Sequence, residues 1–174
     1  MPFAVTLRFD ETSARALEAM WRLLAKGGID SDRHELGYPP HVTLAIYQDD
    51  VPARRLQDGV ASCAARWSAV PISLSGLGVF PGSNSVLWAA PVVTHQLLTL
   101  HTEWQAAVPE LPMHAHYRTG TWVPHITLSG PLPDPGRALS ALIPRWQPLS
   151  GYLDRLDLVH FRPVVSLASV PLST

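Results

Sequence analysis

Apolar and polar residues alternate at the start of the chain as they do in a half-buried strand. Phe3, Val5, Leu7 and Phe9 take every second position, which predicts a strand with one buried face. Apolar residues then recur at helical spacing until Gly27, which predicts a helix that stops there. The same reasoning predicts further strands at residues 40–47, 70–80, 85–93, 123–129, 150–161 and 164–171, and further helices at residues 52–67, 97–108 and 139–146.

The order of these elements repeats. A β-α-β-α-β-β unit ends near residue 93, and the same order follows, although its opening strand is not evident. Residues 78–91 also resemble residues 160–171, because an aromatic residue and a proline precede an apolar strand in both. We therefore expect residues 1–174 to form one domain of two pseudo-symmetric lobes, about 1–93 and 94–174, with exchange of terminal strands between the lobes allowed.

Composition narrows the classes of function. The chain has 174 residues, of which 47% are hydrophobic and 16% charged, as in a packed globular protein. A formal net charge of −1 argues against tight binding of duplex DNA and favours a small substrate or a strand end. No apolar run is long enough for a membrane span, and the first residues lack a secretory signal pattern. We expect a monomer in the cytoplasm that binds no membrane.

The sequence offers no ligand set for a metal. Cys63 is the single cysteine, which rules out an intrachain disulfide and a cysteine-rich zinc site. His114 and His116 lie two positions apart in the irregular stretch 109–122, but no third ligand stands at short spacing, so we interpret them as a loop pair. A loop of this length is often a lid or a substrate-binding segment, and a plain surface excursion is an equal alternative.

One tetrapeptide occurs twice. His-Val-Thr-Leu at residues 41–44 returns as His-Ile-Thr-Leu at residues 125–128, and a proline precedes each copy. In an extended strand the histidine and the threonine of one copy point to the same face. A single pair of this kind usually marks only a solvated strand face, but two matching copies in matching halves favour a shared site. The candidate catalytic residues are His41, Thr43, His125 and Thr127.

Two histidines and two hydroxyl groups suit phosphoester chemistry. Neutral and protonated imidazole coexist near neutral pH, so one histidine can accept a proton while the other donates one. The hydroxyl groups can donate hydrogen bonds to phosphate oxygens whose negative charge grows in the transition state. The residues alone do not decide which histidine is the acid.

On these motifs the chain resembles the 2H phosphoesterase family, which includes bacterial proteins called 2′-5′ RNA ligases or RNA 2′,3′-cyclic phosphodiesterases. The resemblance implies an α+β fold with two lobes, in which antiparallel sheets line a central cleft and helices lie outside. It also implies hydrolysis of a cyclic phosphate on a nucleotide or RNA end to a phosphomonoester, without metal or other cofactor. By this analogy the 3′ oxygen leaves, His41 is the acid and His125 the base. There are two alternatives. One is reversible 2′-5′ ligation in the same site, and the other is binding of a nucleotide or RNA without turnover.

The chain departs from this family at the positions that follow each motif. Many members carry a basic residue there, whereas this chain has Ala-Ile-Tyr at 45–47 and Ser-Gly-Pro at 129–131. Other residues would then bind the substrate. Strand parity favours Arg8 as the phosphate ligand, and Tyr47, which shares parity with the first motif, as a surface for a base or as a rim residue without a ligand. Arg162 and Arg118 are the remaining candidates.

Overall fold

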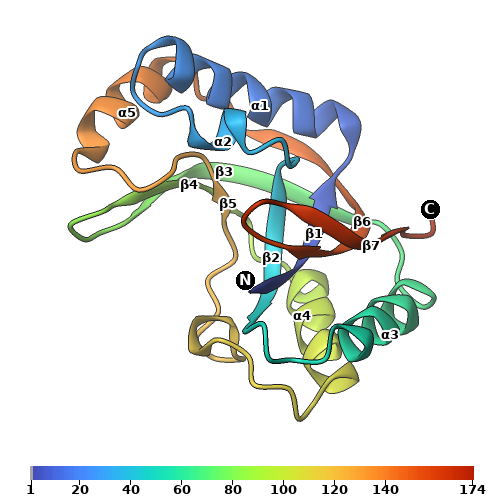
Figure 1. Cartoon of the computed structure of the whole chain (residues 1–174). Coiled ribbons are helices and arrows are strands. Elements are labelled where there is room, and N and C mark those ends of the chain that lie inside the picture. The colour runs from blue at the N-terminus through green and yellow to red at the C-terminus, as the bar shows by residue number, and fades with distance from the viewer. Residues whose placement is uncertain (1) are drawn as a thin grey trace.

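The computed structural model of the protein describes residues 2–174 (Figure 1). The strands are β1 (Phe3–Phe9), β2 (His41–Tyr47), β3 (Val70–Phe80), β4 (Val86–Pro91), β5 (Ile126–Thr127), β6 (Leu149–His160) and β7 (Val165–Pro171). The helices are α1 (Glu11–Lys26), α2 (Asp32–Glu35), α3 (Ala53–Ala64), α4 (His95–Ala107) and α5 (Pro135–Leu142), with 3-10 turns η1 (Ala115–Tyr117) and η2 (Ile143–Arg145). The predicted elements are present, but the strand expected at 123–129 is reduced to β5, and α2 was not predicted.

All strands pair antiparallel in one sheet of order β2-β1-β6-β3-β4-β5, with β7 also paired to β6. Strand β6 is long enough to pair with three other strands. Its residues 149–153 pair with β3, and its later residues pair with β1 and β7. The predicted α+β class with antiparallel strands is confirmed.

The helices cover two different parts of this sheet. Helix α3 packs against β6, β7 and α4, whereas α1 packs against α5 and β6, and α5 against β4. In Figure 1 the pair α1 and α5 lies at one end of the molecule and the pair α3 and α4 at the other. Each part therefore contains elements from both halves of the sequence, because β1 and β6 link them.

The two histidine motifs lie on the two edge strands. Strands β2 and β5 stand at opposite ends of the strand order, yet they contact each other. The sheet must therefore curve until its edges meet, as the strong right-handed twist of antiparallel strands permits. This curvature brings together two motifs that are 84 positions apart in the sequence.

The interior on the helix side of the sheet is one apolar cluster. Leu17 and Trp21 of α1, Leu56 of α3, Trp104 of α4 and Leu142 of α5 all pack in it. Burial of these apolar faces, at roughly 25 cal/mol for each square ångström, is what holds the helices on the sheet. Within residues 2–174, no helix combines the length and apolar character needed to cross a membrane.

Candidate active site

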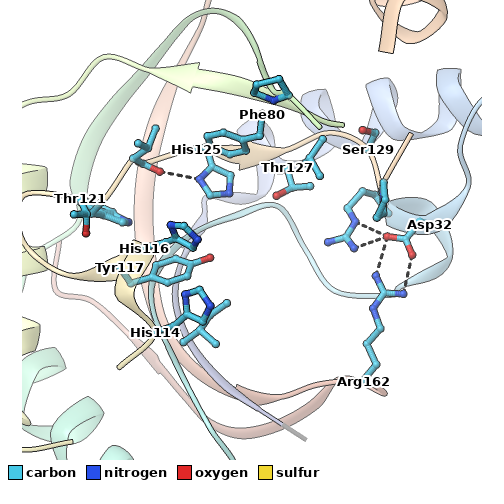
Figure 2. A pocket seen from close by; sticks show the side chains of 18 residues that line it. Asp32, Phe80, His114, His116, Tyr117, Thr121, His125, Thr127, Ser129 and Arg162 are labelled. Carbon is cyan, nitrogen blue, oxygen red and sulfur yellow. Dashed lines mark hydrogen bonds and ion pairs between the residues drawn. The ribbon is translucent and has the colours of Figure 1, made fainter. Parts of the chain in front are cut away.

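A cavity of about 940 Å³ opens at the junction of the two edge strands (Figure 2). This volume is within the range of sites for small molecules. Its walls include His125 and Thr127 of the second motif, and Ile46 of the first motif strand. The other wall residues are Asp32, Arg33, Phe80, Pro81, Val86, His114, His116, Tyr117, Thr121, Trp122, Val123, Ser129, Gly130, Pro131 and Arg162.

His125 has a fixed orientation in this wall. Its Nδ1 lies 2.8 Å from the carbonyl oxygen of Val123. A carbonyl only accepts, so Nδ1 carries the proton and, in the neutral ring, Nε2 has the free lone pair. The Phe80 ring packs edge-on at 4.9 Å and the Trp88 ring at 6.2 Å between centroids. Burial lowers the pKa of His125 below its ordinary value, against the opposing effect of the Val123 hydrogen bond.

His41 repeats this arrangement in a different setting. Its Nδ1 lies 2.7 Å from the carbonyl oxygen of Pro39, also two residues earlier in the chain. Burial, with smaller contributions from the charges of Arg33 and His125, lowers the pKa of His41 to about 4, against the opposing effect of the Pro39 hydrogen bond. His41 and Thr43 do not form the cavity wall themselves. His41 nevertheless begins β2, which contacts β5, the strand that directly follows His125.

The backbone of each threonine is held by a tryptophan. The Nε1–H of Trp122 donates to the carbonyl oxygen of Thr43 at 3.0 Å, and the Nε1–H of Trp21 donates to that of Thr127 at 3.1 Å. The two indole rings come from unrelated places, a loop and helix α1. The two motifs therefore have the same pattern of local hydrogen bonds, one at the histidine and one at the threonine.

Behind His41 lies a buried polar network. The carboxylate of Asp157, which is 1% exposed, accepts from Tyr38 at 2.9 Å and from Ser169 at 2.7 Å. Nη1 of Arg8 also donates to it at 3.3 Å. Arg8 pairs with His41 across β1 and β2, as strand parity predicts. It is engaged by Asp157, however, and does not form the cavity wall, so its contact with a phosphate stays a prediction.

Tyr47 is a correction to the sequence-based interpretation. Val5 pairs with Ala45 while Thr6 pairs with Thr43, so β2 carries an extra residue, Leu44, in a β-bulge. A bulge reverses the alternation of side chains beyond it. Tyr47 is consequently 1% exposed and its hydroxyl accepts from Trp104 at 2.9 Å in the core.

Ile46 takes the place that was predicted for Tyr47. Beyond the bulge it returns to the face of the first motif, and its side chain forms part of the cavity wall. The main chain of Ile46 also accepts a hydrogen bond from the amide of His114 at 2.9 Å. This bond ties the loop 109–122 to the first motif strand.

Arg162 lines the cavity, where it forms an ion pair with Asp32. Its Nη1 and Nη2 contact the two carboxylate oxygens of Asp32 at 2.7 and 2.8 Å. Arg33 donates to the same carboxylate through Nε at 2.8 Å and through Nη2. The hydrogen bond from Arg162 holds the pKa of Asp32 below its ordinary value. Asp32 thus joins two guanidinium groups at one side of the cavity.

The loop 109–122 supplies the opposite side. His114, His116 and Tyr117 line the cavity, with the two imidazole centroids 4.9 Å apart. Arg118, predicted as a substrate ligand, lines a separate cavity of about 460 Å³ with Gln105 and Thr119. Its contact with a substrate stays a prediction.

Sequence reasoning missed Asp32 and Arg33 as site residues. They lie in α2, whose four residues are too few to give a helical pattern of apolar positions. Within residues 2–174, no three His, Cys, Asp or Glu side chains come together as a metal site requires.

Comparison with known proteins gives the family and the fold. A family model described as the 2′-5′ RNA ligase superfamily matches residues 9–163. Among solved structures, TT0787 of Thermus thermophilus is 18% identical, with a TM-score of 0.65 over 99% of this chain and 98% of that chain. E. coli LigT complexed with 3′-AMP is 16% identical, with a TM-score of 0.66 over 100% of both chains. Kluyveromyces marxianus Usb1 is 14% identical, with a TM-score of 0.55 over 98% of both. A search of curated proteins gave no significant match.

Proposed function

This chain belongs to the 2′-5′ RNA ligase superfamily, and from that premise we propose that it hydrolyses a 2′,3′-cyclic phosphate on a nucleotide or RNA end, without a metal ion. The observation that supports this proposal is the matched pair of imidazoles. Both have Nδ1 bound to the carbonyl two residues earlier, which leaves both Nε2 atoms for proton transfer. The contact between β2 and β5 brings the two motifs together.

The reaction needs one proton acceptor and one proton donor. In the proposed step a neutral imidazole takes a proton from water while the water oxygen bonds to phosphorus. The bond from phosphorus to the ribose 3′ oxygen breaks, and the second imidazole, initially protonated, gives its proton to that oxygen. The product is a 2′-phosphate, and the hydroxyl groups of Thr43 and Thr127 bind the non-bridging oxygens.

The surroundings of the two histidines favour His41 as the base and His125 as the acid. With a pKa of about 4, His41 is neutral throughout the physiological range. His125 keeps a pKa that is lowered less, so it is more easily protonated. This order is the reverse of the one that the family resemblance implied.

The loop side of the cavity suits a nucleobase. His114, His116, Tyr117 and Trp122 present flat rings to the cavity, and such rings stack on bases at about 1–3 kcal/mol each. E. coli LigT, a structural relative, has been crystallised with 3′-AMP and with ATP. We propose that the base of the substrate lies against this loop.

The proposal is tested with adenosine 2′,3′-cyclic phosphate. The purified protein should hydrolyse it in the presence of EDTA, and phosphorus NMR should identify the 2′-phosphate as the product. Arg54→Ala is the matched control, because Arg54 lies on the exposed face of α3 in an ion pair with Asp58. Loss of activity in EDTA with recovery on adding zinc or manganese would contradict the proposal. Binding without turnover would favour the non-catalytic alternative.

The order of acid and base is tested with a cyclic substrate that carries sulfur at the 3′ position. A thiolate leaves without protonation, so only the acid becomes dispensable. We expect His125→Ala to recover most of its lost rate on this substrate and His41→Ala to recover none. Recovery by His41→Ala instead would restore the order implied by the resemblance.

A further inference from the structure

We infer that Arg33 and Arg162 form a second phosphate subsite, which binds a phosphate of the substrate that does not react. The inference rests on the proposed function and names its substrate class: a nucleotide with a 2′,3′-cyclic phosphate and a further phosphate on its 5′ oxygen. That further phosphate is either a 5′-monoester or the diester that joins the last two nucleotides of an RNA.

The subsite lies in the same cavity as the reacting residues but apart from them. Figure 2 shows Asp32 and Arg162 on one side of the cavity and His114, His116 and Tyr117 on the other. Thr127 lies between these two sides, and His125 lies above His116 in this view. A nucleotide whose cyclic phosphate meets His125 and whose base meets the loop therefore has the arginine side left for a third group.

The N–H groups of the cluster favour an anion. Two guanidinium groups share the carboxylate of Asp32, and the nearby carboxylate of Asp30 balances the second positive charge. The side chain of Arg162 is 49% exposed, whereas those of Arg33 and Asp32 are 17% and 25% exposed. Asp32 takes two of the five N–H groups of Arg162, which leaves the others for a ligand. The planar fork of guanidinium matches phosphate oxygens.

The carboxylate within the cluster argues against the reacting phosphate as its ligand. Negative charge grows on that phosphate in the transition state, and Asp32 between the two arginines would oppose this growth. Asp32 repels a phosphate of constant charge equally in the ground and transition states, so this repulsion does not raise the barrier of the chemical step. We therefore assign the cluster to binding and not to the chemical step.

The cluster is held at a fixed position relative to the second motif. The amide of Gly130 donates to the Asp30 carboxylate at 3.0 Å. A Cβ atom at Gly130 would come within 2.9 Å of the Cβ of Asp32, so only glycine permits this approach. Gly130, three positions after Thr127, thus makes room for Asp32, the carboxylate that binds both arginines.

The experiment compares kcat/KM for three substrates at one pH and ionic strength. They are adenosine 2′,3′-cyclic phosphate, its 5′-phosphorylated form, and the dinucleotide ApA with a terminal cyclic phosphate. The variants are Arg33→Ala, Arg162→Ala and Arg162→Lys, with Arg54→Ala as the exposed ion-paired control. Thermal melting of each variant checks that it folds, and Arg162→Lys keeps the charge while it loses the fork.

For the wild type we expect kcat/KM to be about tenfold higher for the 5′-phosphorylated substrate than for adenosine 2′,3′-cyclic phosphate, because hydrogen bonds to a charged group provide an energy of this size. Arg162→Ala should reduce this ratio to near one, Arg162→Lys should retain part of it, and Arg54→Ala should keep it. If the dinucleotide shares the advantage, the ligand is an RNA end; if only the monoester does, it is a mononucleotide. Equal losses on all three substrates, or a wild-type ratio near one, would overturn the inference.

A binding measurement separates this inference from the proposed function. Calorimetry with adenosine 2′-phosphate and adenosine 2′,5′-bisphosphate needs no turnover. Tighter binding of the bisphosphate that depends on Arg162 would support the subsite even if the wild type hydrolysed none of the three substrates. Equal affinity for the two ligands would overturn the subsite even if hydrolysis were fast.

Discussion

The first and the second histidine motif share their local hydrogen bonds and differ in what surrounds them. Each histidine donates from Nδ1 to the carbonyl two residues earlier, and each threonine carbonyl accepts from an indole. His41, however, has Arg33 and the Asp157 network beside it, whereas His125 packs against the rings of Phe80 and Trp88. A duplicated motif therefore fixes the geometry of the groups, while the rest of the chain sets their proton affinities.

This difference assigns one role to each member of the acid-base pair. Two imidazoles in identical surroundings could also share one proton, but either of them could then serve as the acid. Here burial and positive charge lower the pKa of His41 more than burial alone lowers that of His125. Burial is the main cause for both histidines, and at His41 the positive charge of Arg33 adds to it.

The largest effects are expected from the histidines. His41→Ala and His125→Ala should each reduce kcat by roughly two to four decades, since each removes one proton transfer. Both side chains are only half-buried at the sheet edges, so the variants should fold normally by circular dichroism. Near-normal turnover by either variant would show that the two motifs do not act as a pair.

The threonines should show a smaller and unequal effect. Loss of one hydrogen bond to developing charge costs at most about 3–4 kcal/mol. Thr127 lines the cavity and Thr43 does not, so Thr127→Ala should reduce kcat more than Thr43→Ala. Thr→Ser at each position keeps the hydroxyl group and is the control. Equal losses, or unfolding of the alanine variants, would argue that the hydroxyl groups have a structural role.

The pH profile measures the asymmetry directly. The base must be neutral, so kcat/KM should fall below about pH 4, the pKa of His41. The acid must be protonated, so kcat/KM should also fall, by tenfold for each pH unit, above the lowered pKa of His125. A bound phosphate stabilises both protonated rings, so the kcat profile should lie at higher pH. An alkaline limb of kcat/KM that begins only above pH 7 would contradict the assigned environments.

The lowered pKa of His41 should also make the stability of the fold depend on pH. Unfolded His41 takes up a proton near its ordinary pKa of about 6.5, whereas the folded form does so only near 4. Between these values the unfolded state binds more protons, so stability is lost as pH falls from about 6.5 to about 4. Thermal melting should show a smaller loss for His41→Ala than for the wild type over this range.

The helices and strands could be predicted from the sequence because they follow local periodicity. The duplicated motif is visible in the sequence itself. Prediction from the sequence failed at Tyr47, because a bulge at Leu44 changes parity without a local signal in the sequence. It also failed at Arg33, because a four-residue helix leaves no pattern. The contact of Arg118 with a substrate stays a prediction. The curvature that joins β2 to β5 is a property of the whole sheet. The monomeric state and the cytoplasmic location stay predictions.

The smallest expected effects concern the two indoles that hold the threonine carbonyls. Trp21→Phe and Trp122→Phe each remove one N–H while they keep an aromatic ring, and an ordinary hydrogen bond contributes about 0.5–1.5 kcal/mol. Trp21 is 6% exposed in the core, so its variant should lose stability in urea unfolding with little change in KM. Trp122 stacks on His101 at 3.9 Å and lines the cavity, so its variant should raise KM a few-fold with a smaller loss of stability. If both variants changed stability and KM alike, the two motifs would be supported equivalently, and the difference between them would lie in the histidine surroundings alone.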